Sequence, residues 1–371
     1  MRTPLCDDLG IQYPIFGFTP SPEVAVAISK AGGLGVLGTI RYTQSEELEE
    51  ALTWMDEQLG GLPYGVDVVI PHKIMEAGQQ RELEQMIPEH HRQFVEQVLA
   101  KHGVDELDAS GRAQAITGWM HDQALGQVEV AFRHPIKFIA NALGAPPPEV
   151  IAQARALGIK TAALAGKPKH AQRHRDAGVD YVVAQGHEAG GHCGEVTTMV
   201  LVPEIVDAVH PTPVLAAGGI GCGRQAAAAM ALGAQGVWLG SLWLTSEEYK
   251  LEPQTERGMS IVQEKLIAAS SSDTVRSRVI SGKPARMLKT EWTEAWAAEG
   301  SPGTLPMPLQ GMLVAEAEAR IRGHQSQALL GSPVGQIVGR MNAIEPVAKQ
   351  IGDLVSEFEE TIARMRDLGT P

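Results

Sequence analysis

A histidine in a glycine-rich segment is the strongest candidate for chemistry in this sequence. The segment His187-Glu188-Ala189-Gly190-Gly191-His192 directly follows a short apolar run at 180–184. The imidazole of His192 titrates near neutrality, which suits a base that removes a proton from a substrate. The paired glycines allow backbone N–H groups to come close to an anion or a ring. The alternative is a loop histidine that hydrogen-bonds only to backbone, and the residues alone leave both open.

The same segment partly matches a zinc-binding motif, but its spacing argues against a metal. His187 and His192 are five residues apart, so on a helix they would lie about 140° apart rather than on one face. Cys193 adds a third candidate ligand without a fourth. We therefore predict no metal site.

Two further glycine-rich segments are typical of a phosphate site. Gly218-Gly219 follow an apolar run at 213–217, and Gly240-Ser241 end another at 236–240. In barrels of alternating strands and helices, the loops after the last two strands bind phosphate through backbone N–H groups and a helix N-terminus. The alternative is that these glycines only permit tight turns.

A third glycine run, from Gly33 to Gly38, matches the spacing of a dinucleotide-binding fingerprint. That fingerprint requires the glycines after a strand and before a helix. Here they follow an expected helix and run into a strand. We interpret Gly32 and Gly33 as a tight helix-to-strand turn.

Eight apolar runs separated by helical patterns must position these segments. Runs that are apolar throughout indicate strands buried on both faces, as in parallel sheets, and their alternation with helices is the βα pattern. The sequence therefore predicts an α/β protein with a (β/α)8 TIM barrel. The expected strands are 14–18, 34–38, 64–70, 136–140, 159–164, 180–184, 213–217 and 236–240, and the expected helices are 22–31, 44–59, 147–157, 169–177, 199–209 and 223–232.

Two segments exceed a simple barrel, which we place at 1–71 and 136–245. Residues 72–135 follow the third strand, on the face where barrel active sites occur, and are rich in Glu, Gln, His and Arg. We interpret them as a helical insertion that is either a lid or a structural addition. Residues 246–371 are expected to form a mainly helical C-terminal extension packed on the barrel.

Composition limits the class of protein and its partners. The chain has 371 residues, 44% of them hydrophobic, and a formal charge of −13. This charge disfavours nucleic acid or an anionic membrane as the main partner, and three cysteines predict a reducing, cytoplasmic location. We predict no signal peptide. Residues 225–246 are uncharged, yet their glycines and glutamines predict a buried helix–strand unit rather than a membrane span.

Taken together, these motifs resemble the nitronate monooxygenase (2-nitropropane dioxygenase) family, which also contains FMN-dependent enoyl reductases. The matching runs are PIFGF, AISKAGGLGVLG, YGVDV, AQGHEAGGH, PVLAAGGIGCG and WLGSLW, with SGKPARMLK and PMPLQ matching more loosely. The resemblance implies a TIM barrel that holds FMN without a covalent bond.

The resemblance also assigns site residues. Gly17 and Phe18 would approach the isoalloxazine ring, and Asp67 stands where relatives often carry asparagine. Gln185 and Gly186 would flank the ring and the ribityl chain. The phosphate would be surrounded by three pairs: Gly190 and Gly191, Gly218 and Gly219, and Gly240 and Ser241.

The implied reaction is the oxidation of an alkyl nitronate by O₂ to a carbonyl compound and nitrite. His192 stands at the position of the family's catalytic base and would remove a proton next to the nitro group or orient the substrate. The alternative is an FMN-dependent enoyl- or acyl-CoA reductase or dehydrogenase using NAD(P)H, in which Lys137, Lys283, Arg286 and Lys289 meet CoA phosphates. A non-enzymatic flavin-binding protein is a third hypothesis, and a homodimer is a possible assembly.

Overall fold

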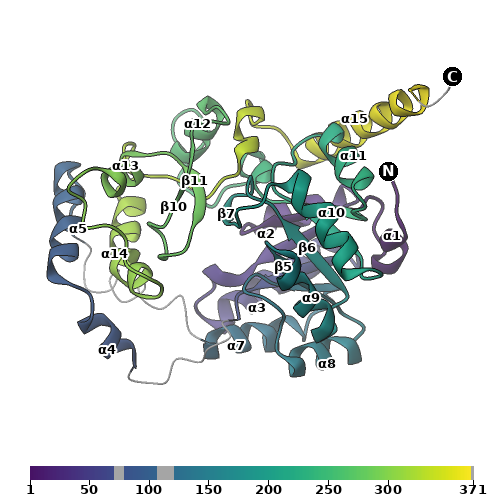
Figure 1. Cartoon of the computed structure of the whole chain (residues 1–371), viewed down its shortest axis with the longest axis horizontal. Coiled ribbons are helices and arrows are strands. Elements are labelled where there is room, and N and C mark those ends of the chain that lie inside the picture. The colour runs from purple at the N-terminus through teal and green to yellow at the C-terminus, as the bar shows by residue number, and fades with distance from the viewer. Residues whose placement is uncertain (71–78, 107–120, 369–371) are drawn as a thin grey trace.

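A closed barrel of eight parallel strands forms the centre of the protein (Figure 1). A computed structural model describes residues 1–70, 79–106 and 121–368 of the chain. All eight expected strands are confirmed, with ends that differ by at most two residues. They are β1 (Ile15–Thr19), β2 (Leu34–Gly38), β3 (Tyr64–Val68), β4 (Phe138–Asn141), β5 (Lys160–Ala165), β6 (Tyr181–Gln185), β8 (Val214–Ala217) and β9 (Gly236–Leu239).

The strands are buried on both sides, which explains their continuous apolar sequences. Alternate side chains point into the barrel, where Phe16, Phe138 and Trp238 pack against one another. The other side chains pack outward against helices. Helix α1 (Pro4–Leu9) adds its apolar residues to the same interior cluster.

Eight helices surround the barrel, one after each strand. The six expected helices are confirmed as α2 (Pro22–Lys30), α3 (Ser45–Leu59), α8 (Pro148–Ala156), α9 (Pro168–Ala177), α10 (Thr198–Val209) and α11 (Gly223–Ala231). The remaining two are the final parts of the predicted additions: α7 (His121–Ala131), which packs on α3 and β3, and α15 (Val347–Asp367), which packs on α11 and α2. The additions proper therefore precede α7 and α15.

These additions meet each other and form a cap. The first contains α4 (Gln79–Gln85) and α5 (Glu89–Lys101), while its residues 71–78 and 107–120 lie outside the described residues. Both helices pack on α14 of the second addition, beside α13, on the opposite side of the molecule from α15 (Figure 1). The second addition contains α12 (Ile261–Ala268), α13 (Glu291–Ala297), α14 (Leu309–Gly323) and the 3₁₀ helix η3 (Gln336–Arg340).

The cap also contains a small antiparallel sheet, which the sequence did not predict for a mainly helical extension. Strands β10 (Thr274–Ser277) and β11 (Ala285–Leu288) form a hairpin, and β11 also pairs with the two-residue strand β7 (Gly191–His192). The cap is thereby joined to the loop that follows β6.

Two interpretations of uncharged or glycine-rich sequence are resolved by the fold. The stretch 225–246 contains α11, β9 and the 3₁₀ helix η2 (Ser241–Thr245), and no helix among the described residues is long and apolar enough to cross a membrane. In the run 33–38, a Cβ on Gly35 would lie 2.0 Å from the carbonyl oxygen of Ala25. Gly33 and Gly35 therefore allow close packing of α2 on β2, while Gly38 faces the ring of Phe18 on β1.

Candidate functional site

The carboxyl ends of the barrel strands bring four of the predicted residues to one mouth. Phe18, Asp67 and Gln185 stand on the inward-facing sides of β1, β3 and β6, because the intervening residues of these strands pack outward. Gly240 follows β9 directly, and Phe18 is its nearest side chain. The mouth thus combines one ring, one carboxyl, one amide and exposed backbone.

His192 comes to this mouth on β7, which β11 holds in register opposite Ala285. Its Nε2 lies 2.6 Å from the hydroxyl oxygen of Ser281. Burial, together with the positive charge of Lys283, lowers the pKa of His192. The imidazole is therefore held in its neutral form, which is the form that accepts a proton.

Ser281 is itself fixed by the cap. It is 2% exposed, and its hydroxyl oxygen also accepts a 3.3 Å hydrogen bond from the backbone N–H of Lys283. The fully buried Gln310, at the start of α14, donates to the carbonyl of Val279 and accepts from the N–H of Leu305. The loop that carries Ser281 is thereby tied to α14.

The loop after β6 is bound at several points to later parts of the chain. The Glu188 carboxylate accepts hydrogen bonds from the N–H and hydroxyl of Thr198, at the start of α10. The buried Arg286 donates to the carbonyl of His187, and the N–H of Gln336 donates to the carbonyl of Glu188. His192 thus stands at the end of a loop with little freedom.

The expected contribution of a helix N-terminus to the phosphate site is not found at α11. The N-terminus of α11 is not available to a phosphate, because the N–H of Gly223 donates to the Glu357 carboxylate of α15, and Glu357 also pairs with Arg224. Glu188 caps α10 in the same way. The protein's own carboxylates take the place that an anion would have at both helix ends.

Backbone N–H groups at the exits of β8 and β9 do fit a phosphate. Within the described part of the chain, the N–H groups of Gly219 and Ser241 make no hydrogen bond. Gly219 has a φ of +70°, which favours glycine. Strands β8 and β9 are neighbours, so two orphaned donors come from adjacent strand exits and can bind an anion. The residues present therefore fit the phosphate end of FMN.

Four of the predicted glycines are required by the packing of the chain on itself. A Cβ on Gly17 would lie 2.3 Å from Ile28, one on Gly186 would lie 2.0 Å from Thr198, and one on Gly190 would lie 2.8 Å from the backbone of Gly335. Gly218, at φ +96°, faces the backbone of Ala189 in the same way. Their direct role in cofactor binding stays a prediction. At Gly191 and Gly240, by contrast, a Cβ would meet nothing closer than 3.6 Å.

Asp67 is a buried carboxyl without a partner. It is 4% exposed, and its carboxyl makes no hydrogen bond or ion pair within the described residues. Burial alone raises its pKa well above the ordinary value. A charged carboxylate in such a place is costly, so burial favours the neutral acid.

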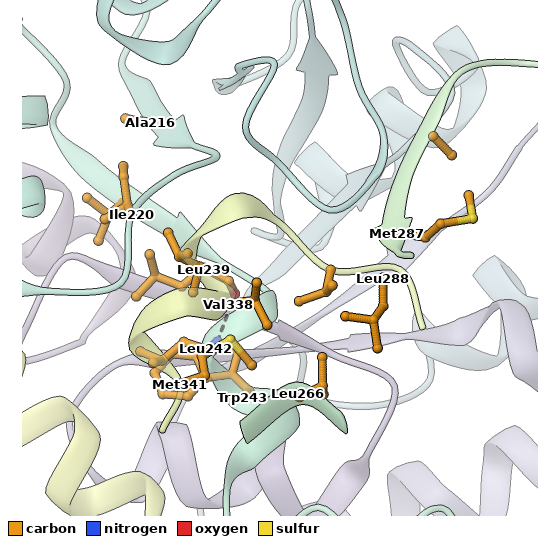
Figure 2. Close-up of a cluster of buried hydrophobic side chains, with 14 of the residues drawn as sticks. Ala216, Ile220, Leu239, Leu242, Trp243, Leu266, Met287, Leu288, Val338 and Met341 are labelled. Carbon is orange, nitrogen blue, oxygen red and sulfur yellow. Dashed lines mark hydrogen bonds between the residues drawn. The ribbon is translucent and has the colours of Figure 1, made fainter. Parts of the chain in front are cut away.

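The cap is joined to the barrel rim by a cluster of apolar side chains (Figure 2). Leu239 and Trp243, at the exit of β9, lie beside Val338 and Met341 of the cap, and the Trp243 indole donates to the carbonyl of Leu239 over 2.7 Å. Trp243 also fills the space beside Gly17. Ser241 adds a polar contact, because its hydroxyl accepts from the N–H of Gly335.

Sequence reasoning missed Ser281 and Gln310. The run SGKPARMLK, which contains Ser281, belongs to the looser part of the resemblance and is the one signal that pointed to this loop. In the described ranges, no group of three His, Cys, Asp or Glu side chains could hold a metal ion.

The cations expected to meet CoA phosphates are spread over the molecule. Lys137 precedes β4 and therefore lies at the amino ends of the strands, away from the mouth, which corrects its expected role. Arg286 is 4% exposed and is used by the chain itself, and Lys289 pairs with Glu294. Lys283 is exposed as well, and of the four cations it is the one whose charge lowers the pKa of His192.

Comparisons with known proteins agree with this fold. The family model for nitronate monooxygenase matches residues 2–357. A Mycobacterium tuberculosis protein with the provisional name monooxygenase Rv1533 is 46% identical, over 99% of both chains. A protein of Staphylococcus saprophyticus, provisionally named nitronate monooxygenase, is 30% identical over 94% of this chain and 97% of its own. Among solved structures, FabK from Thermotoga maritima is 28% identical and covers 99% of both chains with a TM-score of 0.72.

Proposed function

The chain belongs to the nitronate monooxygenase family of oxidoreductases, and we propose that it uses FMN to oxidise an alkyl nitronate with O₂, releasing a carbonyl compound and nitrite. The observation that carries this proposal is the neutral His192 imidazole, fixed by Ser281 at the mouth of the barrel. A neutral base at the mouth suits removal of the acidic C–H proton of a nitroalkane, which yields the nitronate that is then oxidised.

We infer that Ser281 sets the tautomer of His192, with the ring hydrogen on Nε2 and directed at the Ser281 oxygen 2.6 Å away. The same oxygen accepts a hydrogen bond from the N–H of Lys283. That tautomer leaves the lone pair on Nδ1, for which no partner exists among the described residues. Nδ1 is then the atom that takes the substrate proton, while Ser281 prevents the ring from turning.

FMN would lie across the mouth, with its phosphate at the exits of β8 and β9. The orphaned N–H groups of Gly219 and Ser241 would hold the phosphate, while Phe18, Asp67 and Gln185 would face the ring. A flavin bound there supplies an electron acceptor for the substrate and an electron donor for O₂.

The test is aerobic turnover of propionate 3-nitronate by the purified flavin-loaded protein, with nitrite and the carbonyl product both measured. With the parent nitroalkane, 3-nitropropionate, as substrate, we expect His192→Asn to lower kcat/KM about 100-fold or more, because its C–H proton must be removed on the enzyme. The preformed nitronate has no such proton to lose, so its turnover should fall less. Flavin absorbance should be unchanged in this variant. Ser281→Ala should lower the rate less, because it loosens the base without removing it.

His187→Asn is the matched control, since His187 lies in the same loop and its side chain, among the described residues, binds only the carbonyl of Gly194. Its turnover should stay near that of the wild type. If the fully loaded wild type leaves nitronates unchanged, the proposal is wrong. Reduction of its flavin by NAD(P)H and reoxidation by an enoyl thioester would then support the CoA alternative, and inertness to both would support a binding protein.

A further inference from the structure

Within the described ranges, Asp67 is a buried acid at the mouth that the proposed reaction does not use. Its neighbours across the sheet are Gly38 of β2 and Ala140 of β4, which offer no polar side chain. The ring of Phe18 covers Gly38, because a Cβ at that position would lie 2.9 Å from the ring. The carboxyl is therefore surrounded by apolar groups on three sides.

Among the residues that the structure describes, no charged group contributes to the pKa shift of Asp67. In the described residues, β1 contributes Phe18, β2 contributes Gly38, and β4 contributes Ala140. A neutral polar pair lies close by, Thr39 on η1 (Thr39–Arg41) and Gln127 on α7. The Thr39 hydroxyl contacts the backbone carbonyl of Asp67 rather than its carboxyl, and the Gln127 amide donates to the backbone carbonyl of Thr39. The titratable groups across the mouth, His192 and Lys283, do not contribute to the pKa shift of Asp67, whose single cause is burial.

A neutral carboxyl has one O–H donor and one carbonyl acceptor, whereas a carboxylate has acceptors only. The edge of a flavin ring presents both donors and acceptors, so a neutral acid can pair with it as a side-chain amide would. Reduction adds negative charge to the ring, which an O–H donor stabilises and a carboxylate opposes.

We propose that Asp67 binds the edge of the flavin ring as a neutral carboxylic acid, and that the flavin becomes harder to reduce when this proton is lost at higher pH. This inference rests on the proposed flavin site and adds to it a proton that tunes the cofactor. Asp67 acts here through the cofactor and transfers no proton to the substrate.

The test compares the midpoint potential of the bound flavin from pH 6 to pH 9 in the wild type and in Asp67→Asn. Asparagine keeps the donor and acceptor at every pH. We expect the two proteins to agree at low pH and to diverge as pH rises, with the wild-type reduction equilibrium falling about tenfold below that of the variant, or ~30 mV for a two-electron couple. Asp207→Asn, an exposed change of the same charge on α10, should follow the wild type. Parallel curves for the wild type and Asp67→Asn would overturn the inference.

A second measurement needs no flavin. The infrared difference spectrum, flavin-free wild type minus Asp67→Asn at neutral pH, should contain the carbonyl band of a protonated carboxylic acid. The subtraction is needed because burial raises the pKa of Glu318 to about 7, so that this second acid contributes a band to both proteins. Absence of the band from the difference spectrum also overturns the inference. A folded protein that shows the band but binds no flavin would refute the proposed function instead, together with the tuning role.

Discussion

The rim of the barrel and the cap that covers it differ in the kind of contact that holds each of them together. At the rim, and where the cap meets it, main chain lies against main chain: glycines at 190, 218, 223 and 335 lie where a Cβ would come within about 3 Å of another main chain. Between the two additions that form the cap, long side chains make the contacts. Arg320 of α14 binds both carboxylate oxygens of Glu96 on α5, and Phe94 of α5 meets the edge of Trp296 on α13.

This difference teaches which parts of a site leave a mark in the sequence. Close backbone contact admits only glycine, so each such contact leaves a glycine at a fixed place. An interface of long side chains tolerates many residue types and leaves no such mark. The contrast requires that a larger side chain at a rim glycine destabilises the whole protein, and that the loss of a side-chain contact in the cap loosens the cap alone.

The largest effect is expected at the rim, from Gly223→Val. A Cβ there would lie 2.2 Å from the backbone nitrogen of Phe358 and 2.3 Å from the carbonyl oxygen of Leu354. Because main chain cannot yield as a side chain can, α15 must move off α11. We expect a loss of about 3 kcal/mol in the free energy of unfolding, measured by urea denaturation.

Gly352→Ala is the control, on helix α15, against which Gly223 packs. A Cβ there meets nothing within 4 Å, so alanine should stabilise α15 by up to about 1 kcal/mol. If Gly223→Val unfolds at the same urea concentration as the wild type, the rim is not held by backbone contact.

A smaller and more local effect is expected in the cap, from Arg320→Met. The Arg320 side chain is 4% exposed and also donates to the carbonyls of Val104 and Asp105, just beyond the end of α5. Its loss leaves these acceptors without a donor, at a cost of about 1–3 kcal/mol. Hydrogen exchange should become faster in α5 while the barrel strands keep their protection.

Arg322→Met, two residues further along the same helix and exposed, should leave exchange in α5 unchanged. Equal acceleration in the cap and the barrel after Arg320→Met would mean that the two form one cooperative unit, which would contradict the contrast.

The contrast also explains how far the sequence could be interpreted. The eight strands were predictable because strands buried on both faces must be apolar throughout, as in YVVAQ of β6. Helix α15 was assigned to an extension because residues 246–346 separate it from β9, although it packs as the eighth barrel helix. Strand β10 was missed because its four residues are only half-buried and are defined by pairing rather than by composition.

The candidate site likewise has parts that could be predicted from the sequence and parts that could not. The loop that carries His192 was predictable from its glycines, while Ser281 was not, because 89 residues separate it from His192. The expected helix N-terminus failed for a related reason: Glu357, which caps α11, lies 134 residues further along the chain. Side-chain partners that are distant in sequence are set by packing, which no local pattern reports.

The smallest expected effect lies where rim and cap meet, at Lys283. This cap residue is exposed, and its charge contributes to the lowered pKa of His192 on the rim. Lowering that pKa keeps the imidazole neutral, and the proposed enzyme active, further into acid. Lys283→Met should therefore move the acid limb of the kcat/KM profile to higher pH and lower kcat/KM about twofold on that limb, since exposed charges interact weakly.

Two further measurements separate this charge effect from a structural one. High salt should remove the difference between Lys283→Met and the wild type, because it screens exposed charges. Lys289→Met, on the same segment but paired with Glu294 at 3.0 Å, should leave the acid limb in place. A limb that moves to lower pH in Lys283→Met would contradict the sign of the interaction. An unchanged limb would mean that burial alone holds His192 neutral, and that the cap fixes the catalytic loop through contacts such as Ser281 without adding to its electrostatics.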